Sequence, residues 1–126
     1  MEETKFVLVV EDDPILKNLL GHTFAGKYQT LYAANGEEAL KLFEQFKPAL
    51  VLLDLTLPGS IDGFAILETL RKQEGAGKTV PVVVVSNLGE QSAKARAMEL
   101  GANAYLVKAE VDVDEIVAKI GEYLPA

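Results

Sequence analysis

The sequence contains no cysteine and no tryptophan, and histidine occurs only once. Without cysteine the chain can form neither a disulfide framework nor a thiolate metal site. No apolar run approaches the length of about 20 residues that a membrane-spanning helix needs. The first residues also lack the basic start and apolar stretch of a signal peptide. We therefore expect a cytoplasmic protein that does not bind a membrane.

Positive charge is also scarce. The 126 residues include 12 Lys and Arg against 19 Asp and Glu, which gives a net charge of −7. Basic patches supply most of the affinity for nucleic acid, so we expect no direct nucleic-acid binding. Hydrophobic residues make up 49% of the chain and charged residues 25%, which is the balance of a folded domain. The length fits a single domain, expected over residues 1–126.

Short apolar runs alternate with amphipathic segments five times along the chain. The runs are typical of buried strands, and they lie at Phe6–Val10, Thr30–Ala33, Ala49–Leu53, Val80–Val85 and Asn103–Val107. Strands that alternate with helices predict an α/β fold in which helices cover both faces of a parallel sheet. Right-handed crossovers then bring the carboxyl ends of all strands to one edge.

Five helices are expected between and after these strands. N-terminal capping signals precede three of them, at Asp13, Asn35 and Asp112. The other two are expected over Asp62–Gln73, where Asp62 is also expected to act as a cap, and over roughly Gly89–Leu100, and the last helix should end near Leu124. The first helix is expected to bury one apolar stripe, made of Ile15, Leu16, Leu19, Leu20 and either Thr23 or Phe24. Glu74–Lys78 is predicted to be a surface loop.

Functional groups follow the strands at the expected carboxyl edge. Glu11 and Asp12 follow the first strand, Asp54 the third, Ser86 the fourth and Lys108 the fifth. Three adjacent carboxylates repel one another unless a cation joins them, and Mg²⁺ prefers such oxygen ligands. A cation and a nearby lysine are also what phosphoryl transfer requires. The carboxylate of Asp54 could then act as the nucleophile and form an aspartyl phosphate.

Four segments together resemble the bacterial response-regulator receiver domain, over essentially the whole chain: VLVVEDDPIL, LVLLDLTLPG with DGF, VVVVSN and LGANAYLVK. The resemblance implies a flavodoxin-like, doubly wound sheet with strand order 2-1-3-4-5. It also implies that Asp54 is the phosphoacceptor and that Glu11 and Asp12 are the acidic pair of a Mg²⁺ site. The main-chain carbonyl of Thr56 would complete that site.

The same resemblance implies a signalling switch that accepts its phosphoryl group from a sensor histidine kinase or a phosphotransfer protein. Ser86 would be the switch hydroxyl, Tyr105 the switch aromatic and Lys108 the phosphate-pairing lysine. Phosphorylation would draw the Ser86 loop inward, and the face made by the fourth helix, fifth strand and fifth helix would change its affinity for an effector. The only chemistry expected is the domain's own phosphorylation and dephosphorylation, and no motif identifies the effector.

Three positions depart from the family pattern. One residue is inserted between Pro58 and Gly63, and Asn87 replaces the small residue that often follows the switch hydroxyl. Ala109 follows Lys108 where the family usually has proline, often with a cis bond. Because a cis bond to a residue other than proline costs about 3–4 kcal/mol, a trans bond is expected here.

The same residues also bear on three other functions. A phosphatase of the haloacid dehalogenase type resembles Asp-x-Asp at its nucleophile, whereas Asp54-Leu55-Thr56 lacks the second aspartate. A flavodoxin-like FMN carrier needs a Ser/Thr/Gly-rich phosphate loop after the first strand, where this chain is acidic. The third alternative is a receiver-like docking module that works without phosphorylation; the intact acidic set argues against it, and the altered loops leave it open.

Overall fold

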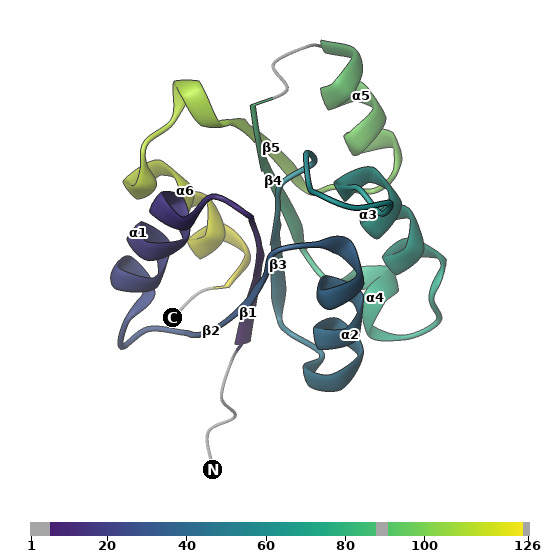
Figure 1. Cartoon of the computed structure of the whole chain (residues 1–126), viewed down its shortest axis with the longest axis horizontal. Coiled ribbons are helices and arrows are strands. Elements are labelled where there is room, and N and C mark those ends of the chain that lie inside the picture. The colour runs from purple at the N-terminus through teal and green to yellow at the C-terminus, as the bar shows by residue number, and fades with distance from the viewer. Residues whose placement is uncertain (1–5, 88–90, 125–126) are drawn as a thin grey trace.

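A computed structural model describes residues 6–87 and 91–124. Its centre is one sheet of five parallel strands in the order β2-β1-β3-β4-β5 (Figure 1). The strands span β1 Phe6–Val10, β2 Gln29–Ala33, β3 Leu50–Leu53, β4 Val82–Ser86 and β5 Ala104–Val107. The predicted fold class and strand order are therefore confirmed, and the strand bounds agree with the apolar runs to within two residues.

The five expected helices are present. They are α1 Pro14–Phe24, α2 Gly36–Phe46, α3 Gly63–Lys72, α5 Gln91–Glu99 and α6 Val113–Tyr123. Asp13, Asn35, Asp62 and Asp112 each accept a hydrogen bond from a backbone N–H in the first turn, which confirms them as N-caps. The expected start of the fourth long helix, at Gly89, lies outside the described residues. None of the helices within the described part of the chain combines the length and apolar character that crossing a bilayer requires.

Two short helical turns were not predicted. Part of the expected loop at Glu74–Lys78 is helical, because a one-turn helix, α4, spans Ala76–Thr79, and a 3₁₀ turn covers Lys108–Glu110. Gly75 enters α4 with φ 102°, a conformation that favours glycine. Gly77 is buried in α4, where an added Cβ would lie 2.8 Å from the carbonyl oxygen of Leu70. The glycines that suggested a flexible loop therefore permit a tight turn against α3.

Each face of the sheet carries its own hydrophobic core. Figure 1 shows α1 and α6 on one side of the sheet and α2, α3, α4 and α5 on the other. Successive residues of β1 alternate between the cores, with Val7 and Val9 facing α1 and α6, and Leu8 and Val10 facing α2 and α3. This double cover explains why the strands are apolar at consecutive positions.

The buried stripe predicted for α1 is partly wrong. Leu20 and Phe24 are buried and Leu16 packs against the core, as expected. Ile15 and Leu19, however, are 70% and 49% exposed. The apolar residues of α1 come in adjacent pairs, 15–16 and 19–20, and adjacent residues on a helix lie about 100° apart. Only one member of each pair can face the sheet, so α1 also has an apolar outer side.

Candidate functional site

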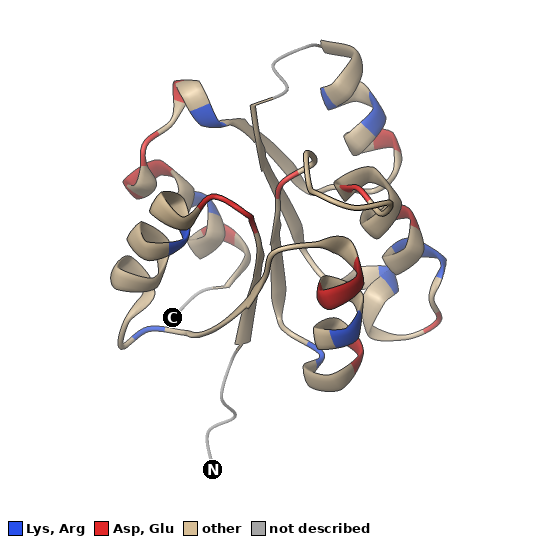
Figure 2. Ribbon diagram, viewed as in Figure 1, with Lys and Arg blue, Asp and Glu red and all other residues tan. Residues whose placement is uncertain are grey.

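The residues expected at the carboxyl edge are held there by the sheet itself. The backbone N–H of Glu11 donates to the carbonyl of Ala33 at 2.9 Å, and that of Asp54 donates to Val10 at 3.0 Å. Parallel hydrogen bonding thus continues one residue past β1 and β3 and fixes both carboxylates at neighbouring strand ends. Figure 2 shows acidic residues after β1 and β3 and at the starts of α2 and α6 on this edge.

Three carboxylates meet at this edge. One oxygen from each of Glu11, Asp12 and Asp54 lies within 4.8 Å of the others. Glu11 and Asp54 are each only 5% exposed, whereas Asp12 is exposed. The predicted convergence of the three acids is therefore found in the structure. Two buried carboxylates and an exposed one form a site that opens to solvent on one side.

Lys108 lies among these acids. Its Nζ is 2.6 Å from Oε1 of Glu11 and 3.1 Å from Oδ2 of Asp54, and its side chain is 15% exposed. Lys108 reaches this position because it directly follows β5 and begins the 3₁₀ turn Lys108–Glu110. One ammonium group therefore balances part of the charge of two buried carboxylates.

Burial alters the proton affinity of Glu11. It raises the pKa of this carboxyl from 4.5 to about 7, and the charge of Asp54 acts in the same direction, although the hydrogen bond from Lys108 lowers it in part. Burial lowers the pKa of Lys108, but its hydrogen bonds to Glu11 and Asp54 outweigh that effect and leave the pKa raised. The lysine stays charged, and Glu11 exchanges its proton near neutral pH.

Backbone N–H groups orient the two buried carboxylates. Oε2 of Glu11 accepts hydrogen bonds from the N–H groups of Asp12 at 3.0 Å and Asp13 at 3.2 Å. Oδ1 of Asp54 accepts from the N–H of Thr56 at 3.1 Å, which closes a local turn. Thr56 is the residue whose main-chain carbonyl is predicted to bind the metal, and this hydrogen bond connects its backbone directly to the side chain of Asp54.

Ser86 and Tyr105 lie on adjacent strands beside this cluster. Ser86, the last residue of β4, is fully buried, and it pairs in register with Val107 of β5. Tyr105 pairs with Val84 and packs, partly buried, against the core under α2 and α3. Ser86 therefore ends the strand that lies between β3, which presents Asp54, and β5, which presents Lys108. Tyr105, within β5, precedes Lys108 by three residues.

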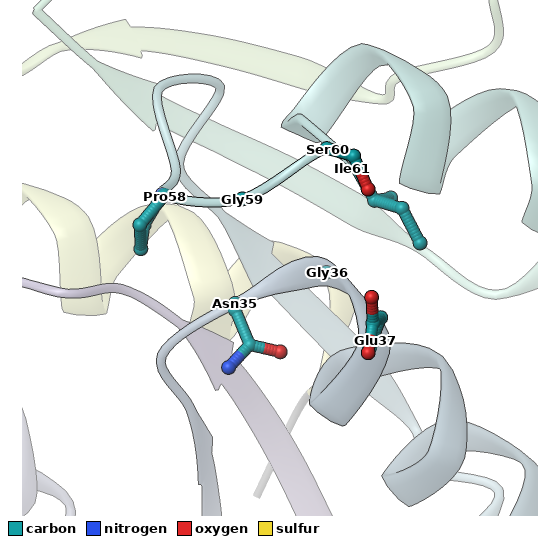
Figure 3. A pocket seen from close by; sticks show the side chains of 7 residues that line it. All are labelled: Asn35, Gly36, Glu37, Pro58, Gly59, Ser60 and Ile61. Carbon is teal, nitrogen blue, oxygen red and sulfur yellow. The ribbon is translucent and has the colours of Figure 1, made fainter.

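The altered loops have defined conformations. The bond between Lys108 and Ala109 is trans, as expected, since the described residues include no cis peptide. The segment with the inserted residue lies across from the start of α2, and a cavity of about 270 Å³ separates them (Figure 3). That cavity is lined by Asn35, Gly36, Glu37, Pro58, Gly59, Ser60 and Ile61. None of the clustered acids lines it, so the cavity is distinct from the acidic site.

The acidic site has the donor set of a hard divalent cation. Among the residues that the structure describes, its candidate ligand atoms are carboxylate oxygens, with no nitrogen or sulfur ligand, and its two buried acids share the ammonium of Lys108. Mg²⁺ takes one or two protein carboxylates, keeps several waters and binds phosphate oxygens, which suits a site open on one side. The residues therefore fit Mg²⁺.

Comparison with known proteins agrees with this geometry. Residues 7–121 match the family model of the response regulator receiver domain. Sporulation initiation phosphotransferase F of Bacillus subtilis is 35% identical over 120 residues, which are 94% of this chain and 93% of that protein. Other curated relatives, such as the probable transcriptional regulator ycf27 of Porphyra purpurea, are longer, and the chain spans about 40% of their length.

Solved structures of response regulators share the fold of this chain. A putative response regulator from Chloroflexus aurantiacus superposes with a TM-score of 0.86 at 33% identity, over 98% of this chain and 100% of that one. The Mn²⁺-bound form of response regulator Rcp1 superposes with a TM-score of 0.81 at 26% identity, over 95% and 94% of the two chains.

Proposed function

This chain belongs to the response-regulator receiver family, and from that premise we propose that Asp54 is the residue that accepts its phosphoryl group. Members of this family are phosphorylation-dependent switches of two-component signalling, and this domain is one of them. The observation that carries our assignment is the position of Asp54 at the end of β3, 5% exposed and 3.1 Å from the ammonium of Lys108. We take residues 1–126 as one receiver domain, because the family match covers 7–121.

A bound Mg²⁺ would be held by Glu11, Asp12, Asp54 and the main-chain carbonyl of Thr56. Support comes from the 4.8 Å spacing of the three carboxylates, from the hydrogen bond between Thr56 and Asp54, and from the metal-bound form of Rcp1. When bound, the ion neutralises charge on the phosphoryl oxygens and aligns the group with Asp54. Glu11 and Asp12 would bind the ion as carboxylates, which requires Glu11 to lose its proton.

The chain itself supplies the nucleophile. A carboxylate oxygen of Asp54 attacks phosphorus, a new O–P bond forms, and the bond between phosphorus and the donor's leaving atom breaks. For a phosphohistidine donor the electron pair leaves on the imidazole nitrogen. Dephosphorylation is a separate reaction, in which water attacks phosphorus, the bond between phosphorus and the Asp54 oxygen breaks, and inorganic phosphate leaves while the carboxylate is regenerated. We propose that the only reactions the domain catalyses are its own phosphorylation and dephosphorylation.

Lys108 would change partners during this cycle. It now contacts Glu11 at 2.6 Å and Asp54 at 3.1 Å. A phosphoryl group on Asp54 carries about two negative charges in place of the single charge of the carboxylate, and the lysine has a flexible stem with which to follow them. Ser86, at the adjacent strand end, would donate a hydrogen bond from its hydroxyl to a second phosphoryl oxygen. Tyr105 would then turn inward, which changes the surface formed by α5, β5 and α6.

Receiver domains receive their phosphoryl groups from histidine kinases or phosphotransfer proteins, and we propose that such a donor contacts α1. Ile15 and Leu19, 70% and 49% exposed, lie one turn apart on the outer side of this helix. The helix begins two residues after Asp12, so the apolar pair adjoins the acidic edge. A helical donor with an apolar contact face would therefore place its phosphohistidine beside Asp54. The downstream effector is a separate partner.

The alternative is a receiver that docks without phosphorylation. Its support is the altered segment between Pro58 and Gly63, which forms one wall of the cavity near the site. This alternative predicts no covalent change in the chain, whereas phosphorylation of Asp54 would add a measurable mass.

Intact mass after incubation with acetyl phosphate, with and without Mg²⁺, tests the proposal. We expect a gain of one phosphoryl group that needs Mg²⁺ and that is absent in Asp54→Asn. Asp62→Asn is the matched control, because Asp62 caps α3 outside the acidic cluster and should leave labelling intact. No gain in a protein that folds and binds Mg²⁺ would favour the docking module.

A further inference from the structure

Helix α5 buries little apolar surface against the rest of the domain. Within α5 only Ala97 is buried, and Ala93 and Leu100 pack partly buried against the core. By contrast, α3 buries Phe64, Ile66, Leu67 and Leu70. Hydrophobic stabilisation scales with buried apolar area, so α5 is among the less stably packed elements. Polar contacts therefore decide the position of α5 to a larger extent than that of α3.

The C-terminal end of α5 is held by Arg71, from the last turn of α3. Nε and Nη2 of Arg71 donate to the carbonyl of Gly101 at 3.1 and 2.8 Å. The same guanidinium donates to the carbonyl of Gly77 at 3.0 Å and to Oδ1 of Asn103 at 3.1 Å. A planar group with several simultaneous hydrogen bonds keeps a fixed geometry. The turn that follows α5 is therefore held firmly against α3.

The middle of α5 makes a different kind of contact. The guanidinium carbon of Arg96 lies 4.1 Å from the ring centroid of Phe64, in the first turn of α3. Arg96 is exposed, whereas Phe64 is only 8% exposed. At an exposed site such a cation–π contact changes an equilibrium by about two- to fivefold. The contact of Arg96 is thus much weaker than the hydrogen-bonded one of Arg71, and small movements can break it.

Phe64 is in turn connected to the backbone of Asp54. The preceding residue, Gly63, donates its N–H to the carbonyl of Leu55 at 3.0 Å. A Cβ on Gly63 would overlap the carbonyl oxygen of Asp54 and lie 2.5 Å from Cα of Leu55. The start of α3 therefore packs directly on the peptide that follows Asp54, with no space between them. A shift of that peptide must move Phe64.

We propose that Arg96 is a positioning residue that couples the state of Asp54 to α5 through Phe64. This inference rests on the proposed phosphorylation of Asp54. When the peptide after Asp54 shifts, Phe64 moves with α3, the contact with Arg96 changes, and α5 reorients about its C-terminal end at Gly101. Arg71 keeps that end in place. The path is separate from the one through Ser86 and Tyr105, because it leaves the site through β3 and α3.

Amide hydrogen exchange of α5 in the full chain, without Mg²⁺ or donor, tests the contact itself. Arg96→Gln should raise exchange in α5 by about two- to fivefold and leave β4 and α6 unchanged. Lys94→Gln removes the same charge from the same helix and should have no such effect. In a Phe64→Leu background, Arg96→Gln should add nothing further. Equal effects of the two charge variants, or faster exchange throughout the domain, would overturn the proposal.

The coupling is tested by repeating the exchange with Mg²⁺ and acetyl phosphate, at equal phosphorylated fractions verified by intact mass. Phosphorylation should change exchange in α5 of the wild-type chain, and Arg96→Gln should reduce that change. If Arg96 were only a structural contact, the variant would raise exchange equally in both states, and the coupling would be refuted. If the wild-type chain gained no phosphoryl group, the proposed function would be refuted instead. The exchange data without donor test the Arg96–Phe64 contact separately, so the two failures can be distinguished.

Discussion

Lys108 Nζ lies 2.6 Å from Oε1 of Glu11, closer than the 3.1 Å that separates it from Oδ2 of Asp54. The lysine that the proposed mechanism assigns to the phosphoryl group is thus paired mainly with a carboxylate of the proposed metal site before phosphorylation. A cation bound by Glu11 would compete with this pair, and a phosphoryl group on Asp54 would replace it. The ammonium of Lys108 is therefore a counter-ion whose partner would change when a cation or a phosphoryl group occupies the site.

Removal of this counter-ion should destabilise the metal-free domain. Breaking a buried ion pair costs about 3–5 kcal/mol, but Glu11 can take up a proton, so we expect a loss of about 1–3 kcal/mol in Lys108→Met. Mg²⁺ should restore most of it, because the ion replaces the missing positive charge. Urea unfolding with EDTA or Mg²⁺ measures both effects. Lys119→Met, which removes an exposed partner of Glu122, should cost less than about 1 kcal/mol, and an equal loss in both variants would contradict the role of Lys108.

The pKa of Glu11 makes the stability of the metal-free domain depend on pH. Burial raises this pKa from 4.5 to about 7 in the folded chain, so between these values the folded state binds more protons than the unfolded state. Stability must then fall as the pH rises from about 4.5 to 7. Urea unfolding in EDTA across this range should show the decline, and Glu11→Gln should flatten it. Glu44→Gln, at an exposed position, should leave it unchanged, and a wild-type curve parallel to that of Glu11→Gln would contradict the shift.

The apolar pair on α1 should matter for a protein donor and not for a small one. For any histidine kinase or phosphotransfer protein that labels the chain, Ile15→Ser and Leu19→Ser should lower the transfer rate about tenfold, which corresponds to a loss of about 1.4 kcal/mol of binding. Labelling by acetyl phosphate should not change, since that donor needs no docking surface. Met98→Ser, at a residue of α5 that is 41% exposed, is the control. Equal loss with both donors would show that the substitutions act on the site and not on docking.

A glycine should be preferred at the end of α2. Lys47 caps this helix with φ 48° and ψ 60°, a left-handed conformation in which side chains are strained. Lys47→Gly should therefore stabilise the domain by about 0.5–1 kcal/mol, even though it removes the exposed contact with Glu44 at 3.4 Å. Lys47→Ala removes the same contact but keeps Cβ, so its thermal unfolding temperature should not rise. A rise for alanine as large as that for glycine would point away from backbone strain.

The strands, the starts of the four capped helices and the edge where the functional groups gather were predictable from the sequence alone. Each depends on neighbours in the chain: consecutive apolar residues form a buried strand, and a side chain such as that of Asp112 caps the N–H of Glu115 three residues on. Once the strands are parallel, Glu11, Asp54 and Lys108 must reach the same edge. Local patterns and one topological rule therefore determined the acidic cluster and the lysine beside it.

Only the tertiary structure decided how these groups pair and which surfaces stay exposed. The preference of Lys108 for Glu11, the outward position of Ile15 and Leu19, and the stacking of Arg96 on Phe64 depend on how separate elements pack. Arg71 donates hydrogen bonds to a carbonyl group 30 residues away in the chain. Every residue has a backbone carbonyl, so the sequence does not indicate which one accepts these hydrogen bonds. Periodicity indicates that a helix has an apolar side, but the width of the side that becomes buried is set by the neighbouring elements.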